Sequence, residues 1–206
     1  MIKGIDISHH QGKIDWKKVA ADGIKFAYIK ASQGASFVDK MAVENVRGAK
    51  EAGILCGLYH YFTPTGDAGA QFTNFWSVLM NCGGPKGLLT PVLDVEGDDK
   101  NQVDMGFDKY AESANAWLTY LASKTLRYGI VYTYPFFAYK LRGKLSKYPL
   151  WAASYPKLTL ENGVLTGFPG WDNYTLWQYS NKGKVSGIKG YVDLDSANID
   201  IKSLVI

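Results

Sequence analysis

Two carboxylates at the end of an apolar run are the side chains in this sequence with the clearest potential for chemistry. The run reads Leu-Leu-Thr-Pro-Val-Leu-Asp-Val-Glu over residues 88–96, which predicts a buried strand ending in Asp94 and Glu96. Residues two apart on a strand point to the same face, about 6.6 Å from each other along its axis. Burial and the like charge of a neighbour both raise the pKa of a carboxyl group. Two acids whose pKa values are pushed apart in this way are what hydrolysis of a glycosidic bond requires.

Other interpretations of these acids stay open at this point. The pair also fits a strand end at which carboxylates meet water or cap a following helix. Glu96 is the preferred candidate for the proton donor, with a surface carboxylate beside the acidic turn at 97–99 as its alternative. Asp6 stands between two isoleucines, where a lone acid implies either a function or a buried hydrogen bond. Asp193 is a further candidate, and it competes with Asp195, which would share its face of an extended segment.

The elements that would position these acids alternate between short apolar runs and helical patterns. The predicted strands cover residues 2–8, 25–31, 54–62, 88–96, 128–134, 148–155 and 174–180, with a further short run around Asp193. Helical periodicity covers residues 15–22, 38–52, 68–81 and 104–124. This alternation predicts a parallel sheet, and seven or eight repeats within 206 residues predict closure into a barrel.

The predicted fold is therefore an α/β, TIM-like (β/α) barrel of irregular form, in a single catalytic domain over residues 1–206. The first half should be regular, whereas after Tyr134 the helices become short or vanish. The carboxyl ends of barrel strands converge on one rim, where active sites lie. That rim would gather the four candidate catalytic acids, which are Asp6, Asp94, Glu96 and Asp193.

Polar and aromatic residues at the same strand ends are candidates for substrate binding. Aromatic residues make up 14% of the chain, more than a core of this size commonly needs, and rings can lie against the apolar faces of sugars. Some of these rings should instead fill the barrel. The candidates for substrate binding are Lys30, Tyr59, Tyr61, Trp151, Tyr155, Trp177 and Gln178.

Composition argues against several other classes of protein. The formal net charge is only +4 and no long basic run is present, so nucleic acid is not an expected partner. No cofactor or metal is expected, because His9, His10 and His60 are scattered and fit structural hydrogen bonds better than a metal site. The two cysteines, Cys56 and Cys82, fit buried thiols, although a disulfide between them stays open.

The chain also lacks the patterns of export and of membrane insertion. The N-terminus has no basic segment followed by a long apolar stretch, and no run reaches the roughly 20 residues of a membrane span. We therefore expect a chain without a signal peptide, which would need export by other means to act outside the cell, and we also expect a monomer.

Taken in order along the chain, these segments resemble glycoside hydrolase family 25, the Chalaropsis-type lysozymes (N-acetylmuramidases) of phage endolysins and bacterial autolysins. The resemblance covers nearly the whole length, and together with the missing signal peptide it implies either a phage enzyme released from the host cytoplasm or a protein exported by other means. It includes Gly-Ile-Asp-Ile-Ser at 4–8, Tyr-His-Tyr-Phe at 59–62, Pro-Val-Leu-Asp-Val-Glu at 91–96, Leu-Trp-Ala-Ala-Ser-Tyr at 150–155, Trp-Gln-Tyr at 177–179 and Val-Asp-Leu at 192–194.

The resemblance implies cleavage of the β-1,4 bond between N-acetylmuramic acid and N-acetylglucosamine in bacterial peptidoglycan. Glu96 would be the general acid/base and Asp94 its partner in a substrate-assisted route, with Asp6 and Asp193 as further acids of the cleft. Two departures are visible: Gln33 stands where the family usually has Glu, and Asp195 where it usually has Asn. A non-catalytic wall-binding module and a chitinase-like hydrolase on the same barrel are the alternatives.

Overall fold

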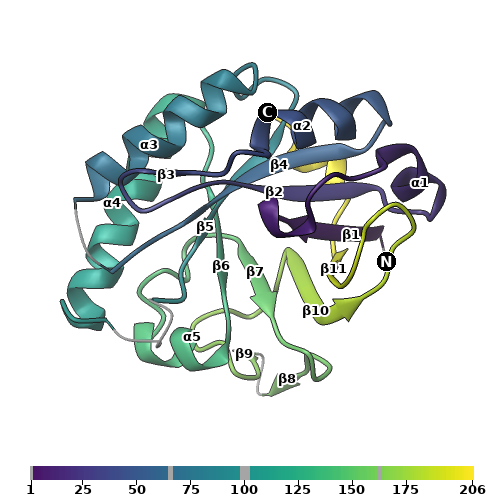
Figure 1. The fold of residues 1–206 in the computed structure, drawn as a ribbon. Coiled ribbons are helices and arrows are strands. Elements are labelled where there is room, and N and C mark those ends of the chain that lie inside the picture. The colour runs from purple at the N-terminus through teal and green to yellow at the C-terminus, as the bar shows by residue number, and fades with distance from the viewer. Residues whose placement is uncertain (1, 65–66, 98–102, 162–163) are drawn as a thin grey trace.

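The protein is described here by a computed structural model, which describes residues 2–64, 67–97, 103–161 and 164–206. Strands and helices alternate through the first two thirds of the chain (Figure 1). The strands are β1 (Ile2–Ile7), β2 (Phe26–Gln33), β3 (Phe37–Val38), β4 (Leu55–Tyr61), β5 (Leu89–Asp94), β6 (Ile130–Thr133), β7 (Leu150–Ala153), β8 (Leu160–Glu161), β9 (Val164–Leu165), β10 (Leu176–Gly183) and β11 (Val192–Ala197). The helices are α1 (Trp16–Ala21), α2 (Ala42–Glu51), α3 (Ala68–Asn81), α4 (Phe107–Thr125) and α5 (Pro135–Leu141), with 3-10 turns η1 (His9–Gln11) and η2 (Ile201–Leu204).

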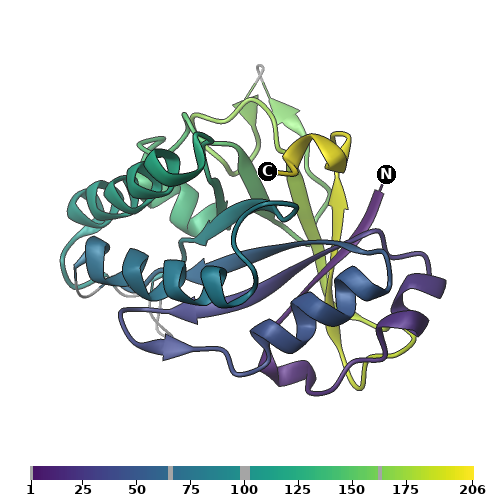
Figure 2. The same cartoon turned by 90° about the horizontal axis from the view of Figure 1, so that it is seen from above.

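Eight strands of the described residues close into a barrel, which confirms the predicted fold class. Their order is β1-β11-β10-β7-β6-β5-β4-β2, and β1 pairs with β2 to close the ring. Helix α2 packs on β2 and β4, α3 packs on β2 and β3, and α4 packs on α3. Figure 2 shows these three helices along one side of the sheet. The chain after Tyr134 is poorer in helix, as expected, because α5 has only seven residues.

The expectation of a parallel sheet is wrong for one barrel strand. β11 runs antiparallel to both of its neighbours, β10 and β1. Only residues 184–191 join β10 to β11, which is too short for a crossover helix, so the chain can only turn back. The reversal brings the start of β11, rather than its end, to the rim formed by the carboxyl ends of the other strands.

Local signals explain most of the helix boundaries. The Asp15 carboxylate accepts a hydrogen bond from the backbone N–H of Lys18 (3.2 Å), so Asp15 is the N-cap of α1. α2 begins at Ala42 rather than residue 38, because Phe37 and Val38 are taken up by β3 in pairing with the end of β2. The small hairpin β8–β9 was not expected from the sequence.

The barrel has two apolar layers, one inside the ring and one between the ring and the helices. Along β2, Phe26 and Tyr28 belong to the inner cluster, whereas Ala27 and Ile29 belong to the outer one. Glycine makes room for the inner rings: a Cβ at Gly57 would lie 2.5 Å from a ring carbon of Tyr28. The inner layer comprises Phe26, Tyr28, Leu89, Val92, Ile130, Trp151, Leu176, Ala197 and Ile201.

Two further expectations concern buried thiols and membranes. Cys56 and Cys82 are both buried free cysteines, which confirms the thiol interpretation. Among the described residues, no helix combines the length and the apolar character that a bilayer span requires.

Candidate active site

The inward-facing positions of the strands change from apolar to polar toward one rim. On β5, Val92 belongs to the inner apolar layer, and Asp94 two residues later lines a cavity. The same step occurs from Ile130 to Tyr132 on β6. The cavity measures about 380 Å³ and is lined by Asp6, Ile7, Ser8, His10, Gln11, Lys30, Tyr59, Tyr61, Asp94, Glu96, Tyr132, Trp151, Tyr155, Gln178, Asn181 and Asp193.

All four candidate acids and six of the seven candidate binding residues line this cavity. The exception is Trp177, whose indole N–H donates to the backbone carbonyl of Ser154 (2.6 Å). Its ring packs beside Tyr174 and Tyr179. Adjacent strand residues face opposite sides, so Trp177 cannot share the cavity with Gln178. Trp151 does line the cavity but is only 2% exposed, held between the rings of Tyr28 and Tyr132.

Glu96 lies two residues beyond the end of β5, yet hydrogen bonds on both sides fix its backbone. The N–H of Val95 donates to the carbonyl of Tyr132 (2.9 Å), and the Thr133 hydroxyl donates to the carbonyl of Val95 (2.8 Å). On the other side, the N–H of Gly97 donates to the Tyr110 hydroxyl of α4 (3.2 Å). The acidic turn of the alternative interpretation continues into residues 98–99, which lie outside the described residues.

The protonation of Glu96 suits a proton donor. Burial raises the pKa of Glu96 to about 7; the Lys30 charge lowers this pKa, and the Asp193 charge raises it. Burial raises the pKa of Asp94 well above its usual range; the Glu96 charge adds to this rise, and the Lys30 charge opposes it. The Lys30 ammonium lies 4.8 Å from the centre of the Tyr61 ring and donates to the side chain of Gln33 (2.8 Å). One cation therefore acts on both acids of this side of the cavity.

The opposite side of the cavity holds a hydrogen-bonded line of side chains. The Tyr132 hydroxyl donates to Gln178 Oε1 (3.1 Å), and Gln178 Nε2 donates to Asp6 Oδ2 (2.7 Å). Asp6 lies directly opposite Asp193 in the β1–β11 register. Burial raises the pKa of Asp6 well above its usual range, and the Asp193 charge adds to this rise. The amide of Gln178 therefore fixes Asp6 from a strand far away in sequence.

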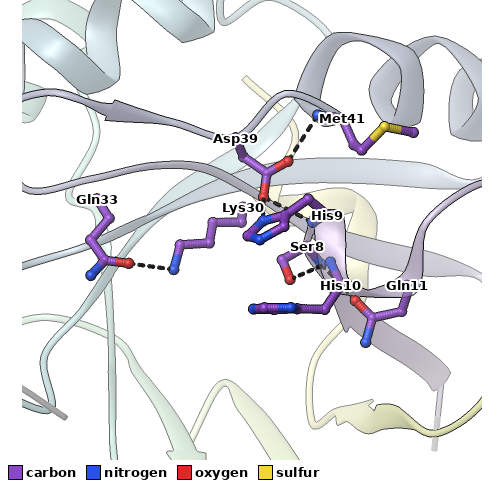
Figure 3. Close-up of polar contacts among 8 residues, drawn as sticks. All are labelled: Ser8, His9, His10, Gln11, Lys30, Gln33, Asp39 and Met41. Carbon is purple, nitrogen blue, oxygen red and sulfur yellow. Dashed lines mark hydrogen bonds and ion pairs between the residues drawn. The ribbon is translucent and has the colours of Figure 1, made fainter.

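The segment after β1 forms the edge of the cavity next to Lys30 (Figure 3). Ser8 and Gln11 form a capping box around η1, which sets the direction of the chain. The buried Asp39 carboxylate accepts hydrogen bonds from the backbone N–H of His9 (2.9 Å) and of Met41 (2.9 Å), and it pairs with His9 Nδ1 (2.8 Å). This network holds the turn that carries His10 to the cavity.

The three histidines differ in role. His60 is buried between Ser32 Oγ (2.8 Å) and Gln71 Oε1 (3.3 Å), and burial lowers its pKa to about 3. His9 pairs with Asp39, so both confirm the expected structural hydrogen bonds. His10 differs from both, because it lines the cavity. Gln11 and Asn181 also line the cavity without having been singled out as site residues, because neither follows an apolar strand pattern that would indicate it.

Comparison with known proteins identifies the family of this barrel. The profile described as "Glycosyl hydrolases family 25" matches residues 5–188. Lysozyme M1 of Streptomyces globisporus is 31% identical over 96% of this chain and 68% of its own, and the autolytic lysozyme of Clostridium acetobutylicum is 34% identical over 94% of this chain and 55% of its own.

Solved structures agree with the sequence comparisons. The bacterial lysozyme of Streptomyces coelicolor superposes with a TM-score of 0.83 at 31% identity, covering 98% of this chain and 94% of its own. A family 25 glycosyl hydrolase of Bacillus anthracis gives 0.82 at 27% identity, covering 98% and 91%. The chain therefore belongs to family 25 of the glycosyl hydrolases and is a glycoside hydrolase of the lysozyme (muramidase) type, not a non-catalytic wall-binding module.

Proposed function

We propose that this enzyme hydrolyses peptidoglycan at the β-1,4 bond between N-acetylmuramic acid and N-acetylglucosamine. Membership of family 25 and the names of its lysozyme relatives support action on the bacterial cell wall. The observation that carries the proposal is Glu96, an acid with a pKa raised to about 7, beside the buried Asp94 in one cavity. At neutral pH such a glutamic acid is partly protonated and can donate to a leaving oxygen.

In the proposed mechanism, Glu96 donates its proton to the glycosidic oxygen as the bond to the anomeric carbon breaks. The acetamido oxygen of the substrate attacks the same carbon, and Asp94 orients the acetamido group and stabilises its developing positive charge. A water molecule then gives a proton to the Glu96 carboxylate and adds to the anomeric carbon, which releases the acetamido group. The products are a new reducing end on muramic acid and a free hydroxyl on glucosamine.

The remaining cavity residues would bind the sugar rings. We assign Tyr155 and Tyr61 to contacts with sugar faces, because their rings line the cavity and Tyr155 is 53% exposed. Lys30, Tyr59 and Gln178 supply polar contacts from three different strands. Trp151 would support the floor of the cavity from its place between Tyr28 and Tyr132.

Mass analysis of fragments released from purified cell walls tests both the bond and the proton donor. The native enzyme should release fragments with a reducing muramic acid end, and Glu96→Gln should lose about 10²–10⁴-fold in turnover because the amide cannot donate the proton. Circular dichroism should show a folded variant. Glu112→Gln, which removes the same charge from an exposed position on α4, should retain full activity.

The same assay separates this function from the chitinase-like alternative. The proposal expects release from peptidoglycan and much slower cleavage of chitin oligomers. Wall lysis at a near-normal rate by Glu96→Gln would refute the assignment of Glu96, and preferential cleavage of chitin would refute the substrate.

A further inference from the structure

Behind the cavity, a third carboxyl group completes a buried cluster with Asp6 and Asp193. Asp195 is 0% exposed and does not line the cavity. β11 enters the barrel from the rim, so Asp193 lies at the rim and Asp195 lies two residues deeper on the same face. Asp6 lies opposite Asp193 in the β1–β11 register, and its side chain interacts with those of both Asp193 and Asp195. Asp6 is thus the middle member of a line of three acids.

The described residues supply few donors to this cluster and no cation. The indole N–H of Trp151 donates to Asp195 Oδ1 (3.1 Å), and Gln178 Nε2 donates to Asp6 Oδ2. No ion pair within the described ranges reaches any of the three carboxyls. Asp195 Oδ2 is fully buried and receives no donor from the described residues. An ionised oxygen in that position would be a buried charge with no hydrogen bond, which is strongly unfavourable.

A proton on Asp195 removes this difficulty, because the carboxylic acid becomes a donor to its neighbour Asp6. We infer that Asp195 is protonated in the folded enzyme and donates a hydrogen bond to Asp6, so that Asp195 is a positioning residue that holds Asp6 in the wall of the cavity. The negative charge of the cluster then resides toward Asp193, which is the least buried of the three.

The groups that face Asp195 agree with this assignment. Burial raises the pKa of Asp195 well above its usual range, and the charges of Asp6 and Asp193 add to that rise. The other titratable groups that feel its charge are tyrosines with raised pKa values, which are uncharged at neutral pH: Tyr28, Tyr155 and Tyr179. None of these groups offers a positive charge to an ionised Asp195.

The pH dependence of unfolding tests the proton directly and does not depend on the proposed function. An acid whose pKa is raised in the folded state stabilises that state at low pH, and this contribution is lost as the pH rises through the folded pKa. Between the ordinary aspartate pKa and that raised value, each retained proton increases the unfolding equilibrium constant about tenfold per pH unit. Urea unfolding followed by tryptophan fluorescence measures this slope.

Asp195→Asn keeps the size of the side chain, the acceptor for Trp151 and a donor for Asp6, but it has no proton to lose. The variant should therefore show a slope shallower by about one proton, or about tenfold per pH unit. Glu112→Gln, which removes a carboxyl from an exposed site, should match the native slope. An Asp195→Asn slope equal to the native one, or steeper, would overturn the inference.

Catalysis gives a second readout, which rests on the proposed function. In the native enzyme the donor to Asp6 is lost at high pH, whereas the side-chain amide introduced by Asp195→Asn donates at every pH. Above the Glu96 pKa of about 7, the alkaline limb of the kcat/KM profile should therefore fall less steeply in the variant, because only the native enzyme loses a second proton there. A merely structural role would lower activity equally at all pH values. If neither protein hydrolyses peptidoglycan, the proposed function fails while the unfolding slopes still decide the protonation.

Titration of the native protein covers the case in which Asp195→Asn fails to fold. The side-chain carboxyl carbon of Asp195, observed by NMR in aspartate-labelled enzyme, should keep the chemical shift of a carboxylic acid at neutral pH. A shift typical of a carboxylate at neutral pH would overturn the inference.

Discussion

The two sides of the cavity hold their buried carboxyl groups by different means. On the β5 side, Asp94 and Glu96 share one cation, because the Lys30 charge lowers the pKa of both. On the β11 side, Asp6 and Asp195 receive only the neutral donors Gln178 and Trp151 from the part of the chain that the structure describes. A nearby cation favours ionised acids, whereas neutral donors in a buried site favour retained protons.

The presence of a cation on one side and of neutral donors on the other fits a catalytic role for the β5 acids and a structural role for the β11 acids. Acids that act on a substrate need pKa values near the working pH, and a nearby cation can balance burial to reach that range. Acids that hold a wall in place need only fixed hydrogen bonds, for which a retained proton is sufficient. We therefore expect changes on the β5 side to alter turnover and its pH dependence, and changes on the β11 side to alter stability first.

The largest effect should come from Asp94→Asn on the β5 side. The amide cannot stabilise the positive charge that develops on the acetamido group, so turnover should fall about 10²–10³-fold. Folding should stay intact, because Asp94 Oδ1 receives no hydrogen bond from the described residues that the variant would remove. Reducing-end release from peptidoglycan measures turnover, and Asp104→Asn at an exposed position is the matched control. Turnover within a few-fold of native would remove Asp94 from the mechanism.

The sequence was sufficient to predict the barrel and most of the β5 side. The strand run at 88–96 and its two acids are local features. The expected alternation, in which residues two apart point to the same face, holds in the structure, since Val92 and Asp94 both face the inside of the barrel. The antiparallel course of β11 was not predictable in this way, since its residues alternate much as a parallel strand would. The reversal follows from the length of the connection, and it brings Asp193 to the rim with Asp195 below it.

The same alternation could have corrected one binding residue in advance. Trp177 and Gln178 are neighbours on β10, so only one can face the cavity, and the structure turns Gln178 inward. His10 could not be placed from sequence, because the turn that carries it depends on Asp39, which is 29 residues away and comes from the segment after β3. Long-range hydrogen bonds of this kind leave no local pattern.

A stability effect is expected on the β11 side from Trp151→Phe. The variant keeps an aromatic ring between Tyr28 and Tyr132 but removes the indole N–H that donates to Asp195 Oδ1. Loss of one partner of a buried polar group costs about 1–3 kcal/mol in the free energy of unfolding. Urea unfolding measures it, with Trp177→Phe as a control that removes an indole donor outside the cavity. If Trp151→Phe were as stable as the native protein, neutral donors would not hold this side.

The smallest expected effect is a shift in pH profile from Lys30→Met. Removing the cation raises the pKa of Glu96 above about 7 and raises that of Asp94, because the Lys30 charge lowers both. Glu96 then keeps its proton to higher pH, and Asp94 also requires higher pH to ionise. Both limbs of the kcat/KM profile should therefore move to higher pH, by about one unit or more for a nearby charge. Lys109→Met, at an exposed position on α4, should leave the profile unchanged. Loss of activity in Lys30→Met without any shift of the limbs would mean that Lys30 binds substrate and does not set the protonation of the two acids. The difference in how the two sides hold their carboxyl groups would then be supported by the β11 side alone.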